Sequence, residues 1–129
     1  MSGSPKPFVG LERQEYMSLT TFRKTGVPVS TPVWFAQAEN RLYVLTDKKS
    51  GKVKRIRNNS AVTVAPCTSS GKLLGSAVEA QVRILPPEEE SAAVRALNKK
   101  YSWKKKVFEL MLVLQRSKRQ NIYLEIVER

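Results

Sequence analysis

Residues 16–46 read YMSLTTFRKTGVPVSTPVWFAQAENRLYVLT, and this stretch decides the fold. Residues 16–22 are rich in β-branched and aromatic types that fit a half-buried pleated surface, so they predict a strand. Lys24-Thr25-Gly26 predicts a hairpin turn, with glycine where φ must be positive. Residues 28–35 and 42–46 predict two more strands, and the short turns between the three make an antiparallel meander.

The second of these strands carries two prolines, Pro28 and Pro32. Neither can donate a hydrogen bond to a neighbouring strand, so the strand must lie at a sheet edge or carry a bulge. Its alternation divides the side chains between two faces, with Val29, Thr31, Val33 and Phe35 on one and Ser30, Pro32 and Trp34 on the other. An incomplete ladder leaves backbone groups for a ligand lying along the strand. Trp34 then either walls an aromatic ring system or fills the core.

The rest of the chain predicts three further strands and four helical segments. The strands are expected at residues 61–65 (closed by Pro66), 75–85 and 121–127, and the helices at 8–15, 51–58, 86–101 and 103–114. In the third helix, glutamates 88–90 fill the first turn and lysines 99–100 the last, which complements the helix dipole. Its apolar stripe is expected to be Val94, Leu97 and Tyr101. Six short strands in a small domain favour a barrel, because closure removes exposed edges.

The composition limits both the domain organisation and the chemistry. With 129 residues the chain can build one core, so we expect a single domain over residues 8–129 behind a flexible arm at 1–7. There is no histidine and one cysteine, Cys67, which excludes Ser-His-Asp and Cys-His nucleophile pairs and argues against a metal site. A lone cysteine, no signal peptide and no apolar run of about 20 residues indicate a cytoplasmic protein.

Positive charge gathers where the third strand gives way to a helix, at residues 46–52. Ser50 is placed to cap this helix, and the N–H groups at its start, beside Gly51 and Lys52, could bind an anion. The spacing is not that of a phosphate-binding P-loop, and an ordinary capped helix with solvated lysines explains the pattern equally well. The net charge of +12 attracts polyanions but does not choose among them.

Five segments taken in order carry a family resemblance: LTTFR at 19–23, PVSTPVWF at 28–35, LYVLT at 42–46, SGKVKRI at 50–56 and VAPC at 64–67. Together they resemble the pyridoxamine 5′-phosphate oxidase-like split-barrel superfamily, and more narrowly its F420-dependent flavin/deazaflavin oxidoreductase branch. The resemblance implies an α+β, mainly β fold, a six-stranded antiparallel split β-barrel with flanking short helices. It also implies a homodimer that holds its cofactor in a groove between the subunits.

The same resemblance implies a set of cofactor-binding residues. Those of the second strand would line the cofactor ring: Ser30, Thr31, Pro32, Val33 and Trp34. Those at the helix start would hold the phosphate: Thr46, Ser50, Gly51 and Lys52, with Leu45 counted beside them. Three more would be available to a longer anionic tail: Lys54, Arg55 and Arg57.

Departures from the FMN-using members of the family bear on the cofactor. Those proteins carry basic residues where this chain has Ser30, Phe35 and Gly51, so two or three phosphate-directed cations are missing, each worth ~1.5–3 kcal/mol. F420 has a phosphodiester and an oligoglutamate tail, a spread of charge that dispersed lysines and arginines suit better. The resemblance therefore predicts an enzyme that transfers a hydride between reduced F420 and a small unsaturated organic acceptor. FMN is the alternative cofactor, and no catalytic side chain is assigned.

Two non-enzymatic alternatives stay open. A basic nucleic-acid-binding barrel would place the clusters at 48–49, 52–57, 104–106 and 116–119 on phosphates, although no nucleic-acid-binding motif is present. A haem-binding split barrel without redox turnover is the other. The acceptor substrate and the role of Cys67, which we expect to be a small buried residue, do not follow from the sequence.

Overall fold

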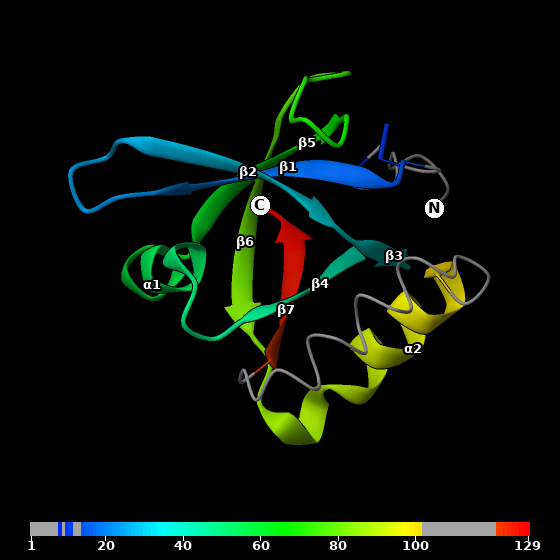
Figure 1. Cartoon of the computed structure of the whole chain (residues 1–129). Coiled ribbons are helices and arrows are strands. Elements are labelled where there is room, and N and C mark those ends of the chain that lie inside the picture. Colours follow the sequence, from blue (N-terminus) through cyan, green and yellow to red (C-terminus); the bar gives the residue numbers. More distant parts are fainter. Residues whose placement is uncertain (1–7, 9, 12–13, 102–120) are drawn as a thin grey trace.

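The computed structural model (Figure 1) describes residues 8, 10–11, 14–101 and 121–129 of the chain. These described residues form seven strands, two α-helices and one 3-10 turn. The strands are β1 (Tyr16–Phe22), β2 (Pro28–Trp34), β3 (Ala36–Ala38), β4 (Arg41–Asp47), β5 (Ala61–Cys67), β6 (Val78–Ile84) and β7 (Asn121–Glu128). The helical elements are α1 (Gly51–Asn58), η1 (Pro87–Glu89) and α2 (Ser91–Tyr101).

The strands form one antiparallel sheet in the order β2-β1-β5-β6-β7-β4-β3. Its two edge strands, β2 and β3, follow one another along the chain and are separated only by Phe35. The sheet must therefore curl until its edges meet at that residue, as Figure 1 shows. This curled sheet confirms the mainly β, split-barrel prediction, with β3 as a seventh strand that the sequence did not indicate.

The predicted meander is wrong at one joint. β1 and β2 pair as expected around the turn at Gly26, where φ is +90°. β2, however, has no other partner among the described strands, and β4 pairs instead with the short β3 and with β7. The chain breaks its ladder at Phe35, so the opening of the barrel lies between β2 and β4. Of the two predicted possibilities, an edge strand or a bulge, the structure has the edge strand, which need not donate on its outer side.

Strand boundaries shifted at two further places. Pro66 does not close β5 but lies within it, opposite Met17, and the strand runs on to Cys67. β6 starts at Val78, three residues later than predicted. Its alternation is confirmed, since Ala80 and Val82 are buried while Glu79, Gln81 and Arg83 are exposed.

The core fills the inside of the curled sheet. Its buried members come from every long strand except β2, from helix α1, from the residue between β2 and β3, and from the segment before β1: Phe8, Leu11, Met17, Leu19, Phe35, Leu42, Val44, Ile56, Val62, Val64, Ala80, Val82, Leu124 and Ile126. From β2, Val33 packs against this cluster. Cys67 is buried, as expected, and burial raises the pKa of its thiol.

Helix α1 confirms its prediction, with Val53 and Ile56 turned inward and Ser50 as its N-cap. Helix α2 begins later than predicted, because the glutamates form the separate turn η1. Its buried side is made by Ala93 and Leu97, whereas Val94 is only half-buried, so the predicted stripe is corrected. α2 packs on the outer face of the sheet, against β3, β4 and β7 (Figure 1).

The helix predicted over residues 8–15 is not formed by the residues described there. Phe8 and Gly10 have positive φ angles of 62° and 97°, and the amide groups of Leu11 and Gln14 each donate to the carbonyl three residues earlier. These turns bring Phe8 and Leu11 into the core, which the apolar pattern did indicate. The arm at 1–7, the side chain of Tyr101 and the helix expected at 103–114 lie outside the described residues. Within the described part, no helix is long and apolar enough to cross a membrane.

Candidate functional site

Helix α1 begins directly after β4, and its first turn is built by local hydrogen bonds. The Ser50 amide donates to the Asp47 carbonyl at 3.0 Å, and the Val53 amide donates to the Ser50 hydroxyl at 3.4 Å. The amides of Gly51 and Lys52 come before the first acceptor that an α-helix provides. They also carry the positive end of the helix dipole, so the start of α1 favours an anion.

Lys52 lies beside this helix start and is anchored to β4. Its Nζ donates to the Thr46 hydroxyl at 3.1 Å, and Thr46 itself is buried. Burial lowers the pKa of Lys52, the nearby Arg55 guanidinium lowers it further, and Asp47 acts in the opposite direction. The ammonium group is thus held in a position where a further negative charge would stabilise it.

Arg55 turns back toward the same corner. Its Nε donates to the Thr21 hydroxyl on β1 at 2.6 Å, and Thr21 is fully buried. A Cβ added to Gly51 would lie only 2.9 Å from Arg55 Nη1, so the guanidinium occupies the space that a side chain at position 51 would take. Two cations, each fixed by a threonine of the barrel wall, therefore flank the first turn of α1. Thr21 was not among the predicted residues, because nothing in the sequence relates it to Arg55.

The predicted residues of β2 lie along the open edge of the sheet. Ser30 and Pro32 are exposed, and the Ser30 hydroxyl shares a 2.7 Å hydrogen bond with that of Thr20. Thr31 pairs with Leu19 and is half-buried. Val33 points into the barrel, toward the core that also holds Ile56 of α1.

Trp34 and Leu45 belong to a different environment, under helix α2. Both pack against the cluster of Ala36 and Leu97, and the Trp34 ring lies tilted beside that of Tyr16, with centroids 6.1 Å apart. The structure thus separates the predicted residues into two groups. The corner at α1 holds Thr46, Ser50, Gly51, Lys52 and Arg55, while Trp34 and Leu45 lie where α2 meets the sheet. Lys54 and Arg57 are exposed on the outer side of α1.

Lys100, near the end of α2, holds the opening of the sheet in place. Its Nζ donates to the carbonyl of Phe35 at 2.7 Å and to that of Gln14 at 2.6 Å, and it lies 3.6 Å from the centre of the Phe35 ring. The Phe35 carbonyl belongs to the single residue between β2 and β3. This contact could not be predicted from the sequence, because both carbonyls come from residues far away along the chain.

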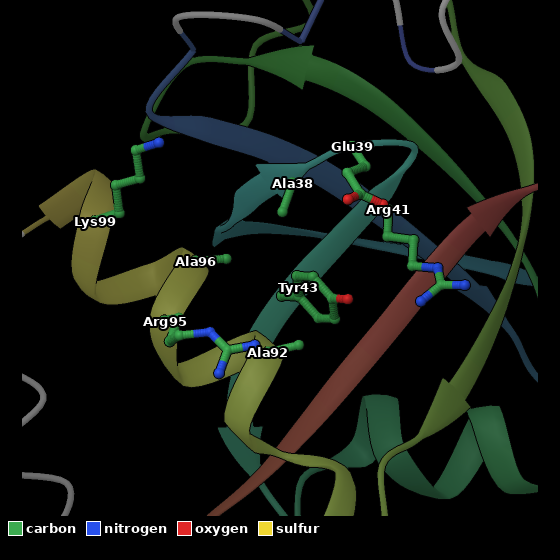
Figure 2. Close-up of a pocket in the computed structure, with 8 residues that line it drawn as sticks. All are labelled: Ala38, Glu39, Arg41, Tyr43, Ala92, Arg95, Ala96 and Lys99. Carbon is green, nitrogen blue, oxygen red and sulfur yellow. The ribbon is translucent and has the colours of Figure 1, made fainter.

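A cleft of about 480 Å³ lies between α2 and the β3–β4 hairpin (Figure 2). Its lining residues come from both sides of this seam: Ala38, Glu39, Arg41, Tyr43, Ala92, Arg95, Ala96 and Lys99. None of them was among the predicted site residues. The cleft could not be predicted from the sequence, because it depends on how α2 is placed on the sheet. The one signal available was the spacing of Arg95 and Lys99, which puts two basic residues one turn apart on the helix.

Comparisons with known proteins agree with the split-barrel fold. A family model described as pyridoxamine 5′-phosphate oxidase matches residues 8–122. Three solved structures have the same fold. The heme storage protein HutZ from Vibrio cholerae has a TM-score of 0.66 at 10% identity, covering 91% of this chain and 83% of its own.

An F420 reductase gives a TM-score of 0.57 at 20% identity, covering 92% of this chain and 90% of its own. General stress protein 26 from Bacillus anthracis gives 0.55 at 25% identity, covering 89% and 79%. No curated protein sequence matches the chain. The similarity to these three structures shows the fold alone.

Proposed function

The chain belongs to the pyridoxamine 5′-phosphate oxidase family, whose model spans residues 8–122, and from this premise we propose that it is an F420-dependent oxidoreductase. The proposed reaction moves a hydride between reduced F420 and a small unsaturated organic acceptor. The observation that carries the proposal is the pair of cations, Lys52 and Arg55, at the start of α1.

This corner fits the phosphoryl group of such a cofactor. Within the described residues neither Lys52 nor Arg55 takes part in an ion pair, and each is oriented by a buried threonine. Burial and the neighbouring guanidinium both lower the pKa of Lys52. An anion between the two groups would relieve that repulsion and would also meet the amides of Gly51 and Lys52. An ordinary solvated helix start does not need two cations anchored in this way.

Two observations favour F420 over FMN. First, Gly51 stands where FMN-using relatives carry a basic residue, and Arg55 fills the space beside it from one turn further along. The corner therefore keeps a guanidinium but lacks the additional cations expected at Ser30 and Phe35. Second, Lys54 and Arg57 remain exposed on α1, where an extended anionic tail could reach them. One of the structures with this fold is an F420 reductase.

The chemistry of hydride transfer would come from the bound deazaflavin ring, so the protein needs chiefly to bind and orient it. In our proposal the α1 corner fixes the phosphoryl group, and the open edge of β2 receives the ring. Lys100 fixes the Phe35 carbonyl at the end of that edge. We also propose that the active protein is a homodimer, which light scattering at several concentrations tests.

The proposal is tested by titrating the purified protein with F420 and with FMN in parallel, following cofactor fluorescence. We expect F420 to bind more tightly, and the reduced form to be reoxidised only when a suitable acceptor is added. Lys52→Ala should weaken F420 binding at least about tenfold, since a charged phosphate contact is worth at least ~1.4 kcal/mol. Lys24→Ala, in the exposed β1–β2 turn, is the matched control. If the protein binds FMN stoichiometrically and does not bind F420, the assignment of F420 as the cofactor is refuted. If Lys52→Ala binds F420 as tightly as the wild type, the assignment of the phosphate site to the start of α1 is refuted.

A further inference from the structure

The cleft between α2 and the β3–β4 hairpin has an apolar floor and a charged rim. Three alanines, Ala38, Ala92 and Ala96, leave space where larger side chains would close the seam between helix and sheet. Tyr43 lies between them and is buried, with its ring facing the cleft (Figure 2). The hollow is therefore shaped for a compact apolar body rather than for a hydrated ion.

Positive groups surround the mouth of this cleft. Arg95 and Lys99 come from α2, and Arg41 comes from β4 on the opposite side (Figure 2). Within the described part of the chain, Arg95 and Lys99 make no ion pair with any carboxylate. Among the lining residues that the structure describes, Glu39 is the one acidic residue, against three basic ones.

The Arg41 guanidinium lies near both the Glu125 carboxylate and the Tyr43 hydroxyl. Its nearest carboxylate, Glu125, lies 3.7 Å away and has closer donors elsewhere. Arg83 Nε donates to Glu125 at 3.0 Å, and the Tyr43 hydroxyl donates to it at 3.3 Å. Arg41 is about half-exposed and borders the cleft on its β4 side, with its guanidinium directed away from α2 (Figure 2).

We propose that this cleft is a second binding site, for a small organic dianion whose apolar body lies on the alanines and Tyr43 and whose two acidic groups reach cations on opposite rims. Its volume of about 480 Å³ is typical of small-molecule sites, which span roughly 300–1,000 Å³. A single inorganic ion would meet only one rim and no apolar surface. The site shares no residue with the α1 corner, so it stands independently of the proposed cofactor.

The probe is 2,6-naphthalenedicarboxylate, which is fluorescent and carries one carboxylate at each end of an apolar ring system. We expect saturable, salt-sensitive binding by the wild-type protein, and no comparable binding of the uncharged 2,6-naphthalenedimethanol or of inorganic phosphate. Arg95→Gln combined with Lys99→Gln should weaken binding at least tenfold. Ala96→Leu should abolish it by filling the cleft without changing charge.

The matched control is Arg23→Gln combined with Lys24→Gln, which removes two positive charges from the exposed β1–β2 turn. This control and Lys52→Ala should bind the probe as the wild type does. Urea unfolding of each variant shows that the fold is retained. If both double variants lose affinity for the probe equally, the probe responds only to the net charge of the protein. If Ala96→Leu binds the probe as the wild type does, the probe binds outside the cleft. Either result overturns the proposal. If the protein does not bind F420 but still binds the probe in the cleft, the cofactor proposal is refuted and the second site is supported.

Discussion

Replacing Lys100 by methionine tests how the opening of the barrel is held. Met has a similar length and helix propensity but removes the ammonium group that bonds the carbonyls of Phe35 and Gln14 and lies over the Phe35 ring. Hydrogen bonds to a charged group are worth ~1.5–3 kcal/mol each and a cation–π contact ~1 kcal/mol. Since Lys100 is half-buried, solvent screens part of this, and we expect a loss of about 2–4 kcal/mol in the free energy of unfolding.

The assay is urea unfolding followed by circular dichroism. With a slope of roughly 2 kcal/mol per molar, the transition midpoint of Lys100→Met should fall by about 1–2 M. Lys99→Met, one residue earlier on the same helix and exposed, is the matched control and should shift it little. Lys100→Arg should lie between them, because a planar guanidinium keeps the charge but not the ammonium geometry. Equal midpoints for Lys100→Met and Lys99→Met would refute the view that this contact holds the sheet edges together.

Three further predictions follow from the site and the core. Burial lowers the pKa of Lys52 below its ordinary 10.5. As the pH rises, the affinity for F420 should therefore decline at a lower pH than it would with an ordinary lysine. Lys52→Arg should remove that decline, because arginine stays ionised up to about pH 12. In the free protein the same shift makes folding stability rise as pH climbs from the lowered pKa toward 10.5, which denaturation at graded pH measures. Gly51→Ala should displace the Arg55 guanidinium and weaken F420 binding while leaving the unfolding midpoint nearly unchanged, a combination that a merely structural glycine would not give. Leu124→Ala, fully buried in the barrel, should cost about 2–5 kcal/mol in unfolding free energy, and a loss below 1 kcal/mol in urea would place Leu124 outside the core.

Local patterns in the sequence predicted most of the fold. The β1–β2 hairpin, helix α1 with its Ser50 cap, and the alternation of β6 each depend on neighbouring residues, so they could be found without knowing the topology. The prolines of β2, which cannot donate to a ladder on both sides, limited this strand to an edge or a bulge, and the structure has the edge. The glutamates before α2 predicted a longer helix, yet Glu88 and Glu89 lie in the separate turn η1 and the helix starts at Ser91.

What failed depends on contacts between distant residues. The break at Phe35 and the short strand β3 exist because β4 pairs with β7, a partner that lies near the end of the chain. In the same way, the anchoring of Arg55 by Thr21 joins residues from two elements with no common motif. The helix start at Ser50 was identified from the sequence. Arg55, the second cation beside it, was instead assigned to a longer anionic tail of the cofactor. The cleft under α2 required the docked helix before its residues could be seen together.

The most direct test of the account compares F420 with the same deazaflavin lacking its phosphate and tail, across a double-mutant cycle at Lys52 and Arg55. If the α1 corner seats the phosphoryl group, each substitution to alanine weakens F420 binding by tenfold or more, their effects are coupled, and neither alters affinity for the phosphate-free compound. Equal weakening for both compounds, or none for either, would contradict the assignment of this corner and with it the proposed oxidoreductase function.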